Sequence, residues 1–262
     1  MGFQARMISV AMITYNGLAF LPAQVTSILD QLLDQDELVI SDDGSTDGTW
    51  DFLTDLARKD TRVHLLRNQG RPGIIGNFDH ALHHCRGEII FLSDQDDLWY
   101  PGKVARLSEV LSDPPRPWLV QSDAELIDDQ DQVTAPSFYA LRHSRPGFWA
   151  NFRRNTYQGC TLAFRRELLA IALPLPAIVP MHDMWLGLLA ELSGQVRFVP
   201  DRLTGYRRHG DNQSALTPRS PGQVIAWRIQ LGLALSGRCL KRWRMIRILR
   251  TIQKQRRMSH GS

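Results

Sequence analysis

Three acidic residues directly follow an apolar run in the stretch "EIIFLSDQDDLW". Asp94, Asp96 and Asp97 come just after the run from Ile89 to Leu92. Carboxylates crowded at the end of a strand repel one another unless a cation or hydrogen-bond donors compensate their charge. Oxygen ligands are those that Mg²⁺ and Mn²⁺ prefer, usually with water and substrate phosphates completing the coordination shell. The pattern therefore favours a site for a divalent metal and a diphosphate.

Two further polar clusters follow apolar runs nearer the N-terminus. "TYN" (14–16) follows the run 7–13, and "SDDGSTDGT" (41–49) follows the run 37–40. Taken alone, the second cluster is explained as well by a turn followed by a helix cap as by a functional site. Asp, Gly and Ser are turn residues, and Asp47 can cap a helix. It also imitates the Asp-x-Asp-Gly-Thr motif of haloacid-dehalogenase-type phosphatases, but Ser41 stands where that motif needs its nucleophilic carboxylate.

The elements that position these clusters alternate along the first 120 residues. Short apolar runs predict strands at 7–13, 37–41, 63–66, 88–93 and 118–122, with helices near 18–31, 47–58, 74–85 and 101–112. This order predicts a mostly parallel α/β sheet with right-handed crossovers. Such sheets bind ligands at the carboxyl ends of their strands. We therefore expect the three polar clusters to share one edge of the sheet.

Composition narrows the class of protein. A chain of 262 residues with 43% hydrophobic content can bury a core as one large domain or two small ones. Cys85, Cys160 and Cys239 lie far apart without a CxxC pair, so we expect neither a disulfide framework nor a zinc knuckle, and a reducing cytosol. The first apolar run is too brief for a signal segment or a membrane span.

The C-terminal segment is strongly basic. From Asn212 onward the chain has 11 Lys or Arg and no Asp or Glu, against 20 basic and 27 acidic residues before it. This split favours an anionic membrane or nucleic acid as partner of the tail. A nucleic-acid module would leave the acidic cluster unexplained, so we expect no nucleic acid. One apolar face (Leu240, Trp243, Ile246, Leu249) opposite a basic face fits a peripheral interfacial helix or a helix packed on the preceding domain.

The motifs also carry a family resemblance. "ISVAMITYN", "ELVISDDGSTDGT" and "GEIIFLSDQDDLWYPGK", in this order, resemble family 2 glycosyltransferases, which are inverting enzymes with the nucleotide-sugar (GT-A) fold. The forms "LSDQDDLW", "HDMW" and "YRRHGDNQS" are most similar to bacterial rhamnosyltransferase-type members acting on surface polysaccharides. The resemblance covers roughly 7–215. It implies a Rossmann-like GT-A domain over 1–215, with a mixed, mostly parallel sheet flanked by helices, a nucleotide-binding half at about 1–125 and an acceptor half at about 126–215. A basic helical extension at 216–262 would follow.

The resemblance assigns roles on the donor side. Thr14, Tyr15 and Asn16, with Asp42 and Asp43, would hold the base and ribose of the donor nucleotide. Gly73 and Asn77 match the loop that lines the nucleotide pocket, although an ordinary glycine-rich surface loop is an open alternative. Asp94 would contact the ribose and Asp96 the metal, Mn²⁺ or Mg²⁺. Asp97 is a neighbouring candidate without an assigned role.

The second half of the chain would carry the catalytic base. Asp183 in "HDMW" matches the family's general base, although alone it reads as an acidic residue capping a helix N-terminus. Gly159 would approach the transferred sugar, and Trp185 lies at helical spacing with Leu188, Leu189 and Leu192. His209 is a candidate metal ligand or a polar loop histidine, and Arg207 is a candidate for facing the diphosphate.

The expected function is transfer of a sugar, first choice rhamnose from dTDP-rhamnose and second a UDP-sugar. The acceptor would be a hydroxyl of a glycan or lipid-linked glycan, and the location cytoplasmic or peripheral on the inner face of the cell membrane. A sugar-nucleotide nucleotidyltransferase is the alternative within the same fold class, but "ITYNGLAFLP" lacks that class's glycine-rich basic phosphate loop. A catalytically inert sugar-nucleotide-binding protein also stays open.

Overall fold

The structure is a computed structural model that describes residues 6–179, 181–208, 222, 226–238 and 240. Contacts divide the chain into two units, 1–217 and 218–262. The described part of the second unit is helical over 226–238. His209 and most of the predicted basic extension, including Trp243, Ile246 and Leu249, lie outside the described residues. Among the described residues no helix combines the length and apolar character needed to cross a membrane.

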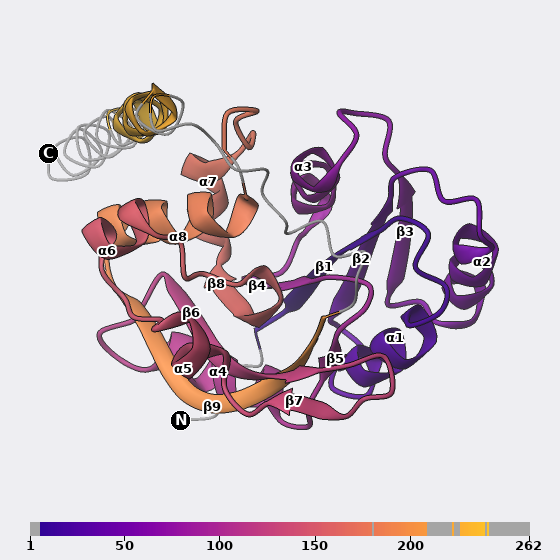
Figure 1. Cartoon of the computed structure of the whole chain (residues 1–262). Coiled ribbons are helices and arrows are strands. Elements are labelled where there is room, and N and C mark those ends of the chain that lie inside the picture. Colours follow the sequence, from indigo (N-terminus) through magenta and orange to yellow (C-terminus); the bar gives the residue numbers. More distant parts are fainter. Residues whose placement is uncertain (1–5, 180, 209–221, 223–225, 239, 241–262) are drawn as a thin grey trace, which may run out of the picture. The chain divides into compact units, whose positions relative to one another are not determined.

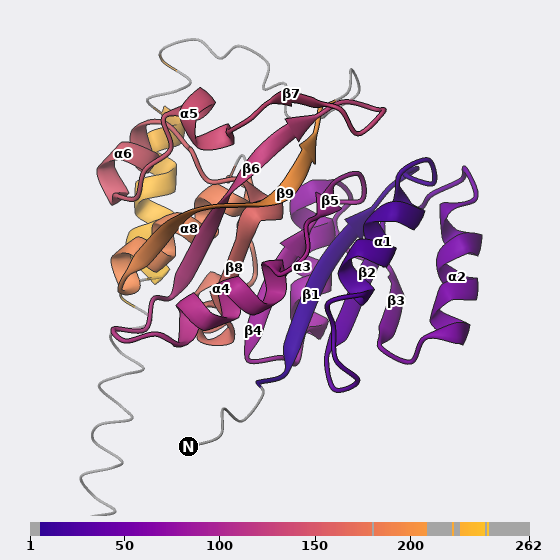
Figure 2. The same cartoon turned by 90° about the horizontal axis from the view of Figure 1, so that it is seen from below.

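The first unit is built on one mixed sheet (Figures 1 and 2). Its described strands are β1 (Ile8–Thr14), β2 (Glu37–Asp42), β3 (Val63–Arg67), β4 (Ile89–Ser93), β5 (Leu98–Trp99), β6 (Leu119–Ile127), β7 (Val133–Ala135), β8 (Leu162–Arg165) and β9 (Val196–Arg207). Their order is β3-β2-β1-β4-β8-β6-β9-β5, with β7 paired to β6. Strands β1 to β4 pair in parallel, as do β6 and β9, whereas β8 runs antiparallel to both β4 and β6.

Helices cover both faces of this sheet. They are α1 (Leu21–Leu29), α2 (Thr49–Lys59), α3 (Ile74–His84), α4 (Lys103–Ser112), α5 (Phe138–Arg142), α6 (Phe148–Arg153), α7 (Leu169–Ala172) and α8 (His182–Ser193), with short 3-10 turns at Gly159–Thr161 and Arg166–Leu168. Figure 1 shows α3 and α8 on one side and α1 and α4 on the other. Because both faces are covered, β1, β2 and β4 are buried at every position, as is typical of parallel strands.

A large apolar cluster joins one face of the sheet to α1, α2 and α4. Val10, Met12 and Phe91 from the strands meet Leu21, Leu53 and Leu107 from the three helices. Only alternate residues of each strand belong to this cluster because successive side chains point to opposite faces of a sheet. The predicted parallel α/β architecture is confirmed, as are the strands and helices predicted over the first 120 residues.

The order in which successive strands join the sheet reverses at β1. The chain adds β2 and then β3 on one side of β1, whereas β4 pairs on its other side. At such a switch point the loops leaving the two strands separate and open a crevice at their carboxyl ends. The loops after β1 and β4 carry "TYN" and "SDQDD", so the topology places both clusters where ligands bind.

Candidate functional site

The three polar clusters interlock at the carboxyl ends of β1, β2 and β4. The Gln95 side chain makes a reciprocal pair with the Tyr15 backbone: Tyr15 N donates to Gln95 Oε1 at 2.7 Å, and Gln95 Nε2 donates to Tyr15 O at 3.0 Å. Asn16 N donates to Ser45 Oγ at 2.9 Å, and Thr46 N donates to Asn16 Oδ1 at 2.8 Å. The prediction that the clusters share one edge of the sheet is thus confirmed.

Asp42 lies beneath this edge rather than in the open site. Its fully buried carboxylate accepts hydrogen bonds from Thr14 Oγ1 (3.0 Å), Gly44 N (3.1 Å), Ser45 N (3.0 Å), Ser45 Oγ (2.5 Å) and an Arg67 guanidinium nitrogen (2.8 Å). A carboxylate so occupied has no exposed oxygen for a base or a ribose. The structure therefore differs from the predicted contact role: Asp42 fixes the loop and the Thr14 side chain.

Asp43, Gly73 and Asn77 bring the loop before α3 to the same edge. The partly exposed Asp43 carboxylate accepts from Asn68 Nδ2 at 2.7 Å and from Gly73 N at 2.6 Å. Gly73 has φ of 87°, which favours glycine. Asn77 Nδ2 donates to Thr14 O at 3.3 Å, while its buried Oδ1 has no partner among the described residues. Asp43 is thus the carboxylate of "SDDGS" that remains accessible at this edge.

Acidic groups converge after β4. One ligand atom each from Asp94, Asp97 and Cys160 lies within 4.8 Å of the other two, a group that does not include Asp96. Burial, together with the negative charges of Asp97 and Asp96, raises the pKa of Asp94 well above its ordinary value. Burial and the Asp96 charge raise the pKa of Asp97 to about 7. Asp96 therefore lies close enough to act on both carboxyls.

Lys103 supplies positive charge under this cluster. Its fully buried ammonium donates to Cys160 O at 2.6 Å and to Thr204 Oγ1 at 2.8 Å, and lies 4.0 Å from the centre of the Trp99 ring. Burial lowers the pKa of Lys103 to about 8, against the attraction of the neighbouring acidic groups. The ammonium lowers the pKa of both Asp94 and Asp97, so it offsets part of their repulsion.

The residues present fit a hard divalent cation. Asp97 Oδ2 is buried without a partner among the described residues, apart from the weak thiol donor of Cys160. Burial raises the pKa of that thiol, which keeps it protonated and a poor ligand. Asp94 and Asp96 are partly exposed beside it. Clustered carboxylate oxygens with one cation beneath them are chemically suited to Mg²⁺ or Mn²⁺.

Asp183 lies in the first turn of α8, close to the same cluster. Its carboxylate accepts from Asn155 Nδ2 at 3.0 Å, from Met184 N at 2.5 Å and from the Gly159 backbone N–H. Burial nevertheless raises the pKa of Asp183 to about 6. The Asp183 charge in turn contributes to the raised pKa of Asp94, so the two carboxyls are neighbours although 89 positions separate them. The structure thus brings together a candidate base and the acidic cluster.

Gly159 and His182 pack tightly beside Asp183. A Cβ on Gly159 would lie 2.6 Å from His182 Nε2, and the imidazole stacks on Phe78 with ring centroids 3.8 Å apart. Burial lowers the pKa of His182 to about 3, and neither ring nitrogen has a hydrogen-bond partner among the described residues. His182 is therefore a neutral, buried ring rather than a surface histidine.

Two further candidates, Arg207 and Trp185, are held by hydrogen bonds within the fold. Arg207 is buried; its N donates to Asp97 Oδ1 (3.1 Å), its Nε to Asp96 O (2.8 Å), and its terminal nitrogens to Asp128 O and Asp131 Oδ1. These hydrogen bonds tie Arg207 to the "SDQDD" loop, and its contact with a diphosphate stays a prediction. Trp185 is fully buried and donates from Nε1 to Ala172 O at 3.0 Å, which anchors α8.

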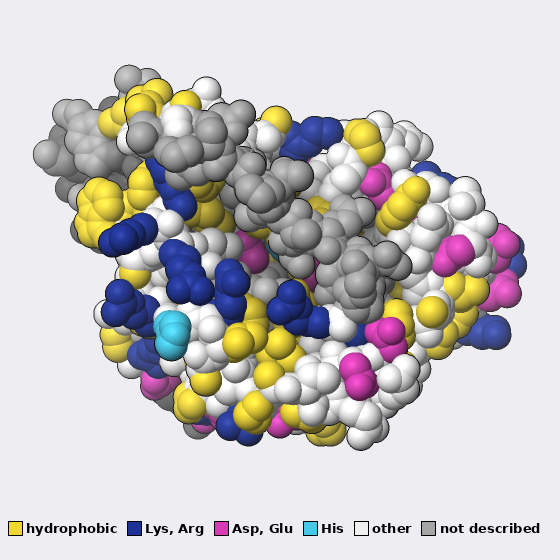
Figure 3. All heavy atoms as spheres, viewed as in Figure 1, with side chains coloured by type: hydrophobic (Ala, Val, Ile, Leu, Met, Phe, Trp, Pro, Cys, Tyr) yellow, Lys and Arg dark blue, Asp and Glu magenta, His cyan; other side chains and the backbone are white. Residues whose placement is uncertain are grey.

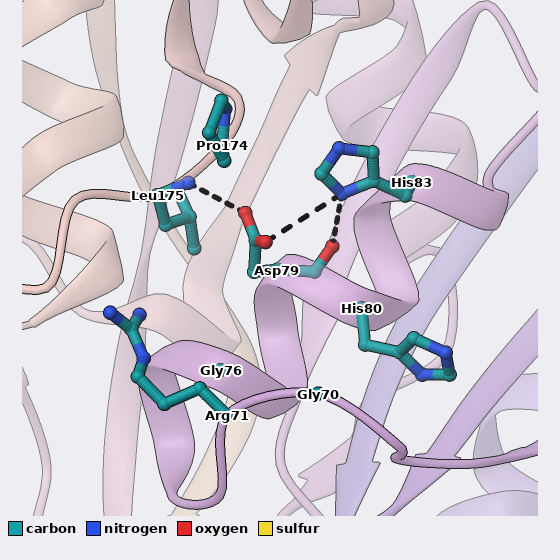
Figure 4. A pocket seen from close by; sticks show the side chains of 8 residues that line it. All are labelled: Gly70, Arg71, Gly76, Asp79, His80, His83, Pro174 and Leu175. Atoms are coloured by element: carbon teal, nitrogen blue, oxygen red, sulfur yellow. Dashed lines mark hydrogen bonds and ion pairs between the residues drawn. The ribbon is translucent and has the colours of Figure 1, made fainter.

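A cavity of about 310 Å³ lies along the outer side of α3 (Figure 4). Gly70 and Gly76, Asp79, His80 and His83, and Pro174 and Leu175 line it together with Arg71. Leu175 N donates to Asp79 Oδ1 at 2.6 Å, so the connection between α7 and α8 is tied to α3. The cavity adjoins the loop before α3 but contains none of the acidic cluster.

If this edge of the sheet binds the predicted donor nucleotide, Gln95→Ala should weaken that binding. The substitution removes both hydrogen bonds that hold the Tyr15 backbone, each worth about 0.5–1.5 kcal/mol. A loosened loop should raise the Kd for a nucleoside diphosphate by roughly tenfold, as measured by calorimetric titration. Gln132→Ala, at an exposed turn, is the matched control. Equal affinity of the two variants would contradict the clamping role.

Comparisons with known proteins agree with this geometry. The sequence profile of glycosyl transferase family 2 matches residues 9–170. The chain is 27% identical over 215 residues to an uncharacterized glycosyltransferase of Nostoc sp., covering 78% of this chain and 66% of the relative. It is 33% identical over 99 residues to the Escherichia coli UDP-Glc:alpha-D-GlcNAc-diphosphoundecaprenol beta-1,3-glucosyltransferase WfaP, covering 38% of this chain and 39% of that protein. The chain thus spans two thirds or less of these relatives.

Solved structures share the fold at low sequence identity. S. aureus TarS 1–349 in complex with UDP-GlcNAc has a TM-score of 0.67 and 16% identity, covering 87% of this chain and 66% of that one. Mannosyltransferase PcManGT from Pyrobaculum calidifontis, in complex with GDP-Man and Mn²⁺, has a TM-score of 0.59 and 23% identity, covering 91% and 64%. These likenesses establish the GT-A fold, and with the match over 9–170 the chain belongs to glycosyl transferase family 2.

Proposed function

We propose that this chain is a metal-dependent, inverting glycosyltransferase that acts on a nucleoside-diphosphate sugar in the synthesis of a bacterial surface glycan. The observation that carries the proposal is that Asp183 lies near the acidic cluster, since its negative charge contributes to the raised pKa of Asp94. A base on one side and a carboxylate-rich diphosphate site on the other are the two parts that displacement at an anomeric carbon requires.

Of the two predicted donors, the relatives favour a UDP-sugar. The Escherichia coli relative is named for UDP-Glc and for an acceptor linked to diphosphoundecaprenol, and the TarS complex contains UDP-GlcNAc. The relatives described above carry no rhamnosyl name, so dTDP-rhamnose stays a prediction from the "LSDQDDLW" form alone. We propose a lipid-linked glycan hydroxyl as the acceptor.

Asp94, Asp96 and Asp97 would hold the metal, with His209 as a further proposed ligand outside the described residues. A bound Mg²⁺ or Mn²⁺ supplies Lewis-acid neutralisation of the departing diphosphate. Arg207 holds the loop by donating to Asp97 Oδ1 and Asp96 O, and the Lys103 ammonium offsets part of the negative charge of Asp94 and Asp97. Tyr15, Asn16 and Asp43 would border the nucleotide, with Thr14, Asn77 and Gly73 shaping that border.

Asp183 would take the proton from the acceptor hydroxyl as its oxygen attacks the anomeric carbon. Asn155 Nδ2 and the Gly159 N–H hold the carboxylate in one orientation, while its pKa of about 6 leaves it ionised yet basic near neutral pH. Attack from the face opposite the leaving diphosphate inverts the anomeric configuration.

A thermal-shift screen tests the proposal. UDP, dTDP and GDP are each added with and without Mn²⁺; a ligand at about 100 times its Kd stabilises the folded protein by about 2.7 kcal/mol. We expect a shift with UDP that needs Mn²⁺. No Mn²⁺-dependent shift with any nucleotide would refute the site. A second assay uses a labelled nucleotide-sugar. If the chain binds nucleotide but transfers no labelled sugar to water or to an acceptor, it is an inert binding protein.

The rate should fall in mildly acidic solution. A general base works only when ionised, and the pKa of Asp183 is raised from 3.8 to about 6, so activity should be lost as pH falls through about 6 rather than about 4. The measurement is kcat against pH at saturating donor and metal. A half-maximal rate near pH 4 would show that an unperturbed carboxyl, not Asp183, is being titrated.

A further inference from the structure

The connection between β7 and β8 is basic although the chain before the tail is acidic. Residues 133–166 contain six Arg and no Asp or Glu. Four of these, Arg142, Arg145, Arg153 and Arg154, are exposed on or beside α5 and α6. Figure 3 shows Lys and Arg side chains gathered over these two helices. This surface therefore presents concentrated positive charge separate from the basic tail.

Exposed aromatic surface lies among these arginines. Phe148 contacts Trp149 at a ring-centroid distance of 5.1 Å and stacks on Phe152 at 5.6 Å. Trp149 is nevertheless 77% exposed, and Leu141 at the end of α5 is 50% exposed. Scattered apolar residues on a surface need no explanation, but here an exposed indole and an exposed leucine lie with four exposed arginines on or beside two consecutive short helices.

The surface is held rigidly against α8. Gly147 N, at the start of α6, donates to Glu191 Oε1 at 2.5 Å. The fully buried Asn151 side chain donates to Arg145 O at 2.9 Å and accepts from Thr156 N at 3.1 Å. Asn155, two residues after the end of α6, donates from its side chain to Asp183. Whatever docks on α6 is therefore positioned relative to the proposed base.

We propose that Leu141, Arg142, Arg145, Trp149 and Arg154, here the aromatic–arginine patch, dock on an anionic lipid bilayer. Tryptophan partitions to the headgroup level of membranes, and arginine pairs with lipid phosphates, sometimes through two hydrogen bonds. Charge complementarity distinguishes this occupant from two others. A second copy of the patch and the basic segment 218–262 both carry positive charge and would be repelled. The proposal does not depend on the donor or on catalysis.

Vesicle binding of the full chain tests the patch. Flotation is measured with phosphatidylcholine vesicles, alone or with about 30% phosphatidylglycerol. Trp149→Ser and the double variant Arg145→Gln/Arg154→Gln are compared with matched controls at other exposed positions, Leu33→Ser and Arg58→Gln/Arg116→Gln. We expect each patch variant to bind anionic vesicles about tenfold more weakly, and each control to change less than about twofold.

The basic tail is a second segment through which the chain could bind lipid. Hydrogen exchange distinguishes binding through the patch from binding through that tail. Anionic vesicles should slow amide exchange across 141–154 in the unmodified chain and not in the patch variants. Protection confined to 218–262, or equal flotation of patch and control variants, would overturn the proposal. So would protection of 141–154 that rises with protein concentration in the absence of lipid, because a second copy would then be the partner of the patch.

Discussion

Asp183→Asn is expected to lower turnover by about 10²–10⁴-fold while the affinity for the nucleotide donor stays nearly unchanged. The amide keeps the shape of the side chain and can still accept from the Gly159 N–H, but it cannot take a proton from the acceptor. Donor affinity should survive because the proposed nucleotide border belongs to the loops after β1, β2 and β4, which contact one another, rather than to α8.

Asp51→Asn is the matched control for this substitution. Asp51 also lies in the first turn of a helix, α2, so it reproduces the loss of a negative charge at a helix N-terminus. If Asp183 only capped α8, both variants would lose some stability and keep full turnover. Equal loss of donor affinity and turnover in Asp183→Asn would show that the residue belongs to the donor site and is not the base.

Asp96→Asn is expected to abolish the Mn²⁺ dependence of UDP binding and to lower turnover by about 10²-fold or more. The Asp96 charge raises the pKa of both Asp94 and Asp97, so Asp96 lies beside them, and its side chain is partly exposed. Without that charge two carboxyls remain, one of them buried.

Calorimetric titration of UDP with and without Mn²⁺ measures this effect. Asp30→Asn, an exposed acidic residue after α1, serves as the control for loss of one negative charge. A variant that still binds UDP more tightly in Mn²⁺, by the same factor as the unmodified chain, would remove Asp96 from the metal site. The Asp94–Asp97 pair would then be the remaining candidate.

Hydrophobic patterning was sufficient to predict the framework of the site. Fully buried parallel strands appear as continuous apolar runs, and the polar clusters that follow them reached one edge as expected. The loops interlock through side chains such as Gln95, whose partner Tyr15 lies 80 positions away. Spacing along the chain carries no information about such a contact.

Burial is what the sequence could not show. Asp42 and Asp43 are adjacent in one motif, yet five donors from separate segments occupy Asp42 while Asp43 stays partly exposed. Arg207 is held by residues some 76 to 111 positions earlier. Nothing in the sequence marked Lys103 or Asn155 as part of the site, because lysine is ordinarily exposed and a lone asparagine in a loop is common.

The proposed reaction requires a metal-binding aspartate cluster and the base Asp183 on two sides of one diphosphate-sugar site. A crystal structure with Mn²⁺ and a UDP-sugar would show this arrangement. We expect the ion to bind carboxylates among Asp94, Asp96 and Asp97 and to touch the diphosphate, with Asp183 on the opposite side of the anomeric carbon. An ion bound elsewhere, or Asp183 directed away from the sugar, would contradict it.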